Sequence, residues 1–406
     1  MIRAHALYFT LIISLIIALI SGSLVLGAFY YRTLSLKHSS EDRLLRNLQS
    51  GITLLLGSED AFSPNEIYQL DLFDEEKDSI CLKLLPWGLF DVGIVKSYSG
   101  KTSFQKALMY GYRPKTDNIA LYLQDLNRPL SLCGNTILKG TCYLPKAGVE
   151  RAYIAGKSYT GTKLIYGDIH TSSNTLPELQ KERLSILQNQ LNNLKSSEAT
   201  LTENSFFEDT HIIQWSSSTV SDTTLLGNII LFSNQHLFIS ASAQLENILV
   251  FAPSITIESN FIGRSQFFAE DSIRVEKEVT LNYPSSLGII KTNASEKRPA
   301  ITIDENSIIQ GFIFSTQLNY DRSKTQISIN KNVKVLGQLY TDGYLDLKGS
   351  IVGNAYVYKF SLKTPASVYE NHLLDAEINI EALPEYFIGT SLFETENQKG
   401  VMAWLK

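Results

Sequence analysis

The chain has 406 residues, of which 36 are basic and 41 acidic, so its formal net charge is −5. This mildly acidic balance argues against the basic surface by which proteins bind nucleic acids, and we expect no nucleic-acid partner. A hydrophobic content of 44% and an aromatic content of 10% exclude a disordered chain, and the length suffices for two or three folded domains.

Residues 6–31 form an apolar run without a charged side chain. A helix rises about 1.5 Å per residue, so this run exceeds the roughly 30 Å hydrocarbon core of a bilayer. A cleaved signal peptide has an apolar region of only about 7–15 residues. We therefore predict an uncleaved membrane anchor, residues 1–35, with the membrane as a partner through residues 6–31. Arg3 precedes the run, and more basic residues follow it (Arg32, Lys37, Arg43, Arg46), which mildly favours a cytoplasmic location for the rest of the chain.

The stretch YFTLIISLIIALISGS resembles the N-terminal helix of type IV pilins and type II secretion pseudopilins. Mature chains of these families often open with Phe-Thr-Leu, which Phe9, Thr10 and Leu11 match. Tyr8 stands where the family has the glycine needed for prepilin cleavage, and Ile13 stands where it usually has a glutamate. The resemblance implies a bulk of chain outside the cytoplasm, which we take as the expected location with the cytoplasmic side as the alternative.

Residues 36–128 are predicted to form an amphipathic helix followed by a small antiparallel β domain. The helix is expected from Ser40 to Gly57, as an amphipathic continuation of the anchor, because leucines and isoleucines recur there at helical spacing. A separate short helix is the alternative. Alternating segments follow between residues 66 and 125, and the polar DEEKD at 74–78 predicts a hairpin turn. Trp87 is expected to be a core or rim aromatic of this domain.

Residues 129–225 combine short apolar segments, separated by glycines, with one helix. Glycine is unfavourable inside helices by about 1 kcal/mol relative to alanine, so this texture predicts β structure. The helix is predicted over 176–195, with Pro177 in its first turn and a leucine stripe on one face. A polar loop is expected over 196–205.

Residues 226–364 contain a degenerate repeat. Apolar strands and polar corners recur in units that begin at Asn228, Asn247 and Ser265. A second form begins at Ile301, Ile327 and Leu345, with glycines at equivalent places (Gly311, Gly337, Gly353). A period of about 18–20 residues with short alternating strands is typical of a parallel β-solenoid, also called a parallel β-helix. The glycines are predicted at its corners, and six side chains are predicted to point inward in columns (Ile301, Ile303, Ile327, Ile329, Leu345, Leu347). QLNYDRSKTQ, residues 317–326, is expected to be an excursion from one corner.

The glycine-spaced apolar pairs over roughly residues 225–362 resemble bactofilins and other polymer-forming, right-handed parallel β-helix proteins. The fold class we predict is therefore mainly β: an N-terminal transmembrane helix, a small α+β domain and a C-terminal parallel β-helix. Residues 365–406 are predicted to be a cap and tail over the last coil, because an uncovered coil end is an exposed sheet edge.

No catalytic, cofactor-binding or metal-binding residue is predicted. The nearest approach to a carboxylate cluster is Glu258 with Glu276 and Glu278, which we interpret as solvated charges. The six histidines have no metal-ligand spacing, and GKTS at 100–103 lacks the preceding glycine of a phosphate-binding loop. Cys81, Cys133 and Cys142 form no CxxC pair, and whether Cys133 and Cys142 form a disulfide is left open.

We therefore expect a membrane-anchored, non-catalytic structural or assembly protein that presents a β-helix as part of a pilus- or secretion-like surface apparatus. Two alternatives remain: a cytoplasmic, membrane-tethered bactofilin-like polymer, and a carbohydrate-active β-helix enzyme. The expected partner is a protein or a second copy, with a glycan as a further candidate. Four tyrosines are expected to be exposed on the β-helix for this purpose (Tyr340, Tyr344, Tyr356, Tyr358).

Overall fold

The computed structural model describes residues 2–58, 62–72, 79–114, 118–192, 194, 202–291, 298–317, 323–393 and 395–406. The chain forms two compact units. The first contains Met1–Leu55, Ile67–Lys83 and Val95–Lys106, and the second contains Leu56–Glu66, Leu84–Ile94 and Ala107–Lys406. The boundaries predicted at residues 35, 128, 225 and 364 stay predictions.

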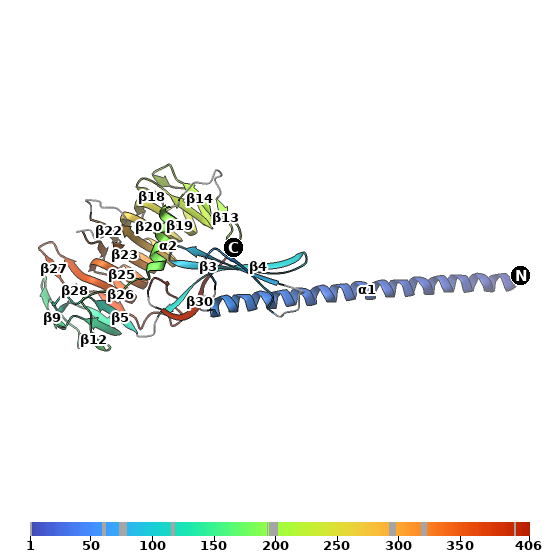
Figure 1. The fold of residues 1–406 in the computed structure, drawn as a ribbon, viewed down its shortest axis with the longest axis horizontal. Helices are drawn as coiled ribbons and strands as arrows, with labels where there is room; N and C mark the ends of the chain where they lie inside the picture. The colour runs from blue at the N-terminus through green and yellow to red at the C-terminus, as the bar shows by residue number, and fades with distance from the viewer. Residues whose placement is uncertain are drawn as a thin grey trace. The chain divides into compact units, whose positions relative to one another are not determined.

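A single unbroken helix, α1, runs from Ile2 to Gly57 (Figure 1). The apolar run and the amphipathic segment are thus one continuous helix, as the first of the two sequence interpretations expected. Four residues on one face of its C-terminal part are buried within the first unit (Leu44, Leu48, Ile52, Leu55). Gly51 lies on the same face, where a β-carbon would come within 2.8 Å of the Val95 side chain. Leu45, one of the leucines that recur at helical spacing between Ser40 and Gly57, is 46% exposed and does not lie on this face.

One sheet has the strand order β1-β2-β3-β4-β30. Its strands are Ile67–Leu70 (β1), Ser79–Trp87 (β2), Phe90–Ser99 (β3), Thr102–Pro114 (β4) and Thr395–Leu405 (β30). β1 and β2 are antiparallel, as the predicted hairpin requires, although its turn at 74–78 lies outside the described residues. β30 pairs antiparallel with β4, so that Leu405 lies opposite Ala107. The described strands between residues 119 and 379 are therefore inserted, in the sequence, between β4 and β30, which are neighbours in this sheet.

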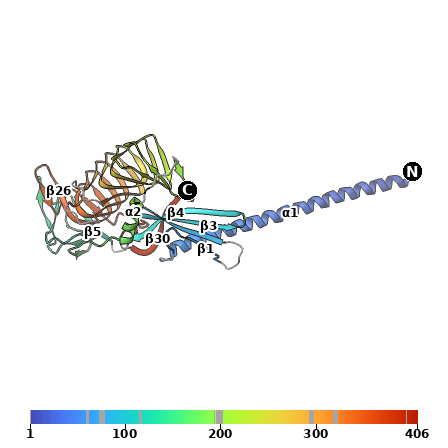
Figure 2. The ribbon, with the colours of Figure 1, turned by 45° about the horizontal axis from the view of Figure 1, so that its top comes forward.

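Most of these inserted strands form a closed, largely parallel sheet, in which successive strands of a stack are hydrogen-bonded side by side (Figure 2). The strands from residue 203 onward are Glu203–Asn204 (β13), His211–Gln214 (β14), Thr219–Val220 (β15), Thr224–Gly227 (β16), Ile229–Phe232 (β17), Leu237–Ile239 (β18), Gln244–Ile257 (β19), Ile262–Val275 (β20), Thr280–Lys291 (β21), Ala300–Ile303 (β22), Ile308–Gln317 (β23), Gln326–Ile329 (β24), Lys334–Leu347 (β25), Ser350–Lys363 (β26), Val368–Glu370 (β27), His372–Leu374 (β28) and Glu377–Asn379 (β29). The earlier strands are Ile119–Leu123 (β5), Leu130–Cys133 (β6), Ile137–Lys139 (β7), Thr141–Leu144 (β8), Val149–Arg151 (β9), Tyr153–Ile154 (β10), Lys157–Ser158 (β11) and Ile169–Thr171 (β12).

The strand register confirms the predicted inward columns. Ile301 pairs with Ile327, which pairs with Leu345, and Ile303, Ile329 and Leu347 form the neighbouring column. All six side chains are at most 1% exposed and belong to one apolar core inside the closed sheet. Because side chains alternate between the two faces of a strand, the residues between them point outward.

The three equivalent glycines also pair in register, Gly311 with Gly337 and Gly337 with Gly353. Their φ angles are +142°, +142° and +145°, a region that other residues rarely adopt. A β-carbon at Gly337 would lie 1.9 Å from the carbonyl oxygen of Gly311, and one at Gly353 would lie 1.8 Å from that of Gly337. Glycine is therefore required here both for backbone conformation and for the close approach of successive strands.

The stacking order differs from the sequence order. β26 pairs with β5, β28 with β6 and β29 with β7, all in parallel, so residues 372–379 lie directly against residues 130–139. β8 then pairs with β5, and β12 with β8. Strands β5, β7, β8 and β12 precede α2 in the sequence, yet in the stack they lie beyond β26 and β29, which follow α2. We call the contact of β26, β28 and β29 with β5, β6 and β7 the joint.

Residues 365–406 were predicted to cap the last coil, and the structure instead divides them between two roles. β28 and β29 are internal members of the stack at the joint, whereas β30 returns to β4. The reason is that these short strands find parallel partners from residues 130–139, which cover the edge that a cap would otherwise cover.

The second helix, α2, spans Lys181–Asn192 and is shorter than the predicted 176–195. Pro177 lies before the helix, and its carbonyl accepts a hydrogen bond from Tyr340 Oη at 3.3 Å, while Gln180 N donates to Leu392 O. These tertiary contacts hold 176–180 out of the helix. Leu184 and Leu187 of the predicted stripe are buried in a second apolar core, outside the closed sheet. The loop predicted over 196–205 lies mostly outside the described residues.

Candidate functional surfaces

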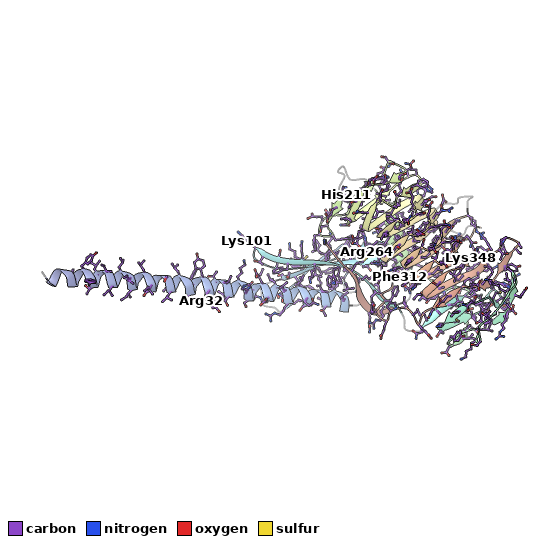
Figure 3. The ribbon with its side chains drawn as sticks, turned by 180° about the vertical axis from the view of Figure 1, so that it is seen from behind. Arg32, Lys101, His211, Arg264, Phe312 and Lys348 are labelled. Atoms are coloured by element: carbon purple, nitrogen blue, oxygen red, sulfur yellow. The ribbon has the colours of Figure 1, made fainter. Side chains whose placement is uncertain are left out.

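The N-terminal part of α1 exposes apolar side chains on every face. Leu15, Leu24 and Phe29 are 57%, 68% and 64% exposed, and the described helix from Leu7 onward is long and apolar enough to cross a membrane. Figure 3 shows Arg32 pointing away from the helix, just beyond the uncharged run. Such a helix is unfavourable in water, because its apolar surface contributes stabilising free energy only when lipid or protein covers it. This is the first candidate surface, and it suggests membrane anchoring.

Phe9, Thr10 and Leu11, the residues of the pilin-like opening, all lie on the exposed part of α1. The Thr10 hydroxyl donates to Leu7 O at 2.9 Å, so its polar group is satisfied within the helix. Ile13 is 53% exposed at the position where the resembling families usually have a glutamate. The structure therefore shows no charged group at that point of the helix.

The second candidate surface is a column of aromatic side chains on the outside of the closed sheet. In register, Phe314 pairs with Tyr340, Tyr340 with Tyr356, and Tyr356 with Tyr122. Tyr143 and His170 continue the column past the joint. Ring centroids of Tyr122 and Tyr356 are 6.1 Å apart, and those of Tyr122 and Tyr143 are 5.4 Å apart, in stacked pairs. The joint is thus reinforced on its outer face by aromatic stacking.

Much of this column is covered, which corrects the expectation for Tyr340. Tyr340 is only 7% exposed, because it packs in the second apolar core with α2 residues and lies 6.0 Å from Phe393, centroid to centroid. Burial raises the pKa of its phenol far above the ordinary value. Phe312, labelled in Figure 3, and Phe314 are likewise buried in that core. Trp87 joins them, with Nε1 donating to Asn247 O at 2.9 Å, so the prediction of a core aromatic is confirmed.

A buried ion pair fixes α2 against the strands that cover the column. The Arg183 guanidinium donates to Asp91 Oδ2 and, at 3.0 Å, to Phe90 O. Both charged side chains are largely buried. Removing one partner of such a pair leaves an uncompensated buried charge, which is strongly destabilising.

Tyr344 and Tyr358, expected to be exposed, are partly buried and covered by cations. The Arg298 guanidinium lies 4.5 Å from the Tyr344 ring centroid, and Lys324 Nζ lies 3.8 Å from that of Tyr358. Burial lowers the pKa of Lys324, while nearby Asp342 opposes the shift. These rings are therefore engaged in cation–π contacts within the protein rather than available as open aromatic surface.

Two of the polar segments singled out in the sequence have structural roles. Glu276 Oε2 accepts hydrogen bonds from Ser259 N and Ser259 Oγ at 3.1 and 3.0 Å, next to Glu258 in the stack. Gly100 and Lys101 form the turn between β3 and β4, with Gly100 at φ +56°. In the described ranges no three or more His, Cys, Asp or Glu side chains are grouped to hold a metal ion.

All three cysteines are free. Cys133 and Cys142 lie in strands β6 and β8, fully buried in separate apolar clusters, so they do not form the disulfide that the sequence left open. Burial raises the pKa of the Cys142 thiol to about 12, which makes it unreactive at neutral pH.

Comparison with known proteins gives little to add to this geometry. No family model matches the sequence, and no curated protein matches it. A solved structure that was found to be similar is the competence-associated pilin ComZ from Thermus thermophilus, at 10% sequence identity and a TM-score of 0.24, with 85% of this chain and 87% of that chain covered.

Proposed function

We propose that the chain is a membrane-anchored, non-catalytic structural protein of a pilus- or secretion-like surface apparatus. The observation that carries this proposal is α1. Its N-terminal part exposes apolar residues all round, whereas its C-terminal part buries Leu44, Leu48 and Ile52 within the first unit. One rigid helix thus provides both a membrane-embedded or helix-packing segment and the attachment of a folded domain.

We propose further that the closed parallel sheet is a β-solenoid and is the part presented outside the cytoplasm. Strand pairs at a spacing near the sequence period support this, for example Ser254 with Ser272 and Ile327 with Leu345. The inward columns and the paired glycines with positive φ support it as well. In a solenoid no single coil can bury its apolar face, so the stack acts as one cooperative body that offers long, regular outer faces.

Self-association or capture of a protein partner through the solenoid is the second part of the proposal. β12 pairs with β8, and its three residues are all exposed, with Ile169 at 55%. Among the described residues, β8 is the strand with which the residues of β12 are in register. A strand edge of this kind is a template for pairing with another chain.

Location and anchoring are tested in native membranes. The full chain should remain in the membrane fraction after carbonate washing, and protease added to spheroplasts should degrade the part that follows α1. Mass spectrometry should find an intact N-terminus. A mature N-terminus near Phe9 would instead support prepilin-type processing, and one near Phe29 would support a signal peptide. Protection from protease in intact spheroplasts, with digestion after lysis, would favour the cytoplasmic polymer.

Assembly is tested by cysteine cross-linking. Leu15→Cys and Leu24→Cys place thiols on the exposed apolar part of α1, while the native Cys133 and Cys142 are buried and do not compete. We expect oxidant-induced, disulfide-linked dimers in native membranes, because each variant adds one thiol to the chain. The wild-type chain, which keeps the partly exposed Cys81, is the control. The absence of cross-links at both positions would contradict assembly through α1. Release of oligosaccharides from a glycan panel by the purified chain would overturn the non-catalytic assignment.

A further inference from the structure

A pocket of about 450 Å³ lies on the outside of the closed sheet, within the second unit and beside the joint. Its floor is formed by neighbouring strands of the stack, with Gln338 on β25, Asn354 on β26 and Tyr122 on β5. Residues 380–393, which lead back toward β30, supply the opposite wall through Leu383, Pro384 and Phe387 among others. The volume falls in the range of small-ligand sites, about 300–1,000 Å³.

The floor contains two amide side chains with unpartnered oxygens. Gln338 is 3% exposed and Asn354 is 7% exposed, and they are register partners on adjacent strands. Gln338 Oε1 and Asn354 Oδ1 are buried, and neither has a hydrogen-bond partner among the residues that the structure describes. A buried polar atom without a partner is unfavourable, so each of these is expected to have a role that justifies it. Both line the pocket, where a ligand with hydroxyl or amide donors would satisfy them.

The walls of the pocket are apolar and largely aromatic. Tyr356 and Phe393 form a stacked pair with centroids 5.6 Å apart, and Tyr122, Tyr143 and Phe387 add further ring surface. The Tyr122 hydroxyl is already engaged, because it accepts from Ser173 N at 2.9 Å and donates to Thr175 O. The rings therefore provide an apolar contact surface, and the two amide oxygens can accept hydrogen bonds that orient the ligand.

Charge restricts the ligand class. The charged residues that line the pocket are Arg113, Glu178 and Glu385, one cation and two carboxylates. Glu178 also lies 3.5 Å from Lys181 Nζ, at the start of α2. A rim of this composition has no excess of positive charge, which a phosphate chain or other polyanion would require. An uncharged ligand that combines hydroxyl donors with an apolar ring face fits both the floor and the walls.

We propose that this pocket binds a neutral saccharide, as one or two sugar residues, with Gln338 and Asn354 accepting hydrogen bonds from its hydroxyl or acetamido groups. The sugar site is additional to the anchored assembly role and does not depend on it. A chain that fails to assemble can still bind sugar, and a chain that binds no sugar can still assemble. The two functions therefore fail separately in experiment.

The test uses the purified full chain in a zwitterionic detergent without a sugar headgroup, since a glycoside detergent would compete. Glucose, galactose, N-acetylglucosamine, maltose, cellobiose and chitobiose are titrated up to about 10 mM by ligand-observed NMR and calorimetry, which covers millimolar affinities. We expect at least one of these sugars to bind. Failure of all six to bind would overturn the proposal.

Asn354→Leu and Gln338→Met remove the unpartnered oxygens while conserving approximate volume. Each should weaken sugar binding by about tenfold or more, through the loss of a hydrogen bond made only in the complex. Because no described residue of the free protein is a hydrogen-bond partner of these oxygens, neither variant should lower Tm. Gln310→Met is the matched control: it replaces a partly buried glutamine on β23 that does not line the pocket, and sugar binding should be unchanged.

Three results would contradict the assignment. Unchanged sugar binding in both Asn354→Leu and Gln338→Met would place the sugar elsewhere. Binding of a single-stranded oligothymidylate, lost in these two variants but not in Gln310→Met, would assign the pocket to nucleic acid. A fall in Tm with unchanged binding in both variants would make the two amides structural.

Discussion

Ile378 and Leu138 are register partners in adjacent parallel strands, β29 and β7, and both side chains are fully buried. The two belong to segments of the chain that are separated by α2 and most of the stack. Near them, Asn135 N donates to Asp375 Oδ1 at 2.9 Å across a sequence separation of 240 residues. The joint is therefore a non-covalent meeting of an early and a late segment, and the closed sheet is continuous only because both are folded.

The first prediction concerns this pair. Leu138→Ala and Ile378→Ala should each lower the free energy of unfolding by about 2–5 kcal/mol, because each leaves a cavity in the core. The double variant should show a coupling of about 0.5–3 kcal/mol, since the residues are in contact. Chemical denaturation measures both quantities. Lys139→Ala, at the adjacent and partly exposed position, is the control and should change stability by less than about 0.5 kcal/mol. Strict additivity of the two alanine variants would argue against the joint.

The second prediction tests the register of the inward columns. Ile329 is fully buried and its neighbour Ser328 is partly exposed, because consecutive side chains point to opposite faces. Ile329→Asp should unfold at least the adjoining coils, since it loses about 1.5–3 kcal/mol of apolar burial and places a carboxylate in the core. Ser328→Asp should be nearly silent in thermal denaturation. Equal effects of the two substitutions would contradict the register.

The third prediction separates two reasons why a position requires glycine: an unfavourable φ angle, and the lack of room for a β-carbon. Gly337→Ala meets both an unfavourable φ of +142° and a β-carbon position 1.9 Å from Gly311 O. Gly148→Ala meets an unfavourable φ of +76° but no atom within 4 Å. We expect Gly148→Ala to cost about 1–2 kcal/mol in unfolding free energy, and Gly337→Ala to cost clearly more. Similar losses for the two variants would mean that the strands can separate to admit a methyl group.

The fourth prediction concerns the dependence of stability on pH. Burial raises the pKa of Asp346, an effect that exceeds the opposing attraction of Lys348, 3.1 Å away. A raised folded pKa means that stability from this group is present below the unfolded pKa, about 3.9, and is lost as pH rises through the folded pKa. Asp346→Asn should therefore raise Tm at pH 7, and its advantage over the wild type should shrink as the pH falls toward 4.

Asp375 provides the matched control with the opposite sign. Hydrogen bonds from Lys157 and Asn135 N lower the pKa of its carboxyl group. Its stabilising contribution is present above the unfolded pKa and is lost as pH falls through the folded pKa. Asp375→Asn should lower Tm at neutral pH and approach the wild type in acid. Differential scanning calorimetry across the range measures both, and parallel pH profiles for the two variants would contradict the assignment.

Sequence reasoning missed the two pocket amides, although a signal for them was present. Gly337-Gln338-Leu339-Tyr340 and Gly353-Asn354-Ala355-Tyr356 are equivalent segments of successive strands, each with an amide after the corner glycine. The preceding segment has Phe312 at the equivalent place. The repeat thus indicated that the two amides would be neighbours, but not that their oxygens would remain unpartnered, because that depends on what residues 380–393 bring over them.

The sequence by itself determined the features that arise from local patterns. The uncharged run of residues 6–31 predicted an apolar helix, and the alternation around Ile301, Ile327 and Leu345 predicted inward columns. The equivalent glycines predicted positions that need a positive φ and leave no room for a β-carbon. Helix, strand and turn preferences act over a few residues, so the sequence shows them directly. Tertiary structure alone decided the rest. The meeting of β29 with β7, the return of β30 to β4 and the burial of Tyr340 each depend on partners far away in the chain. The edge of any apolar, alternating strand can pair with many other strands. Which pairing forms depends on how much apolar surface the whole segments bury when they pack together.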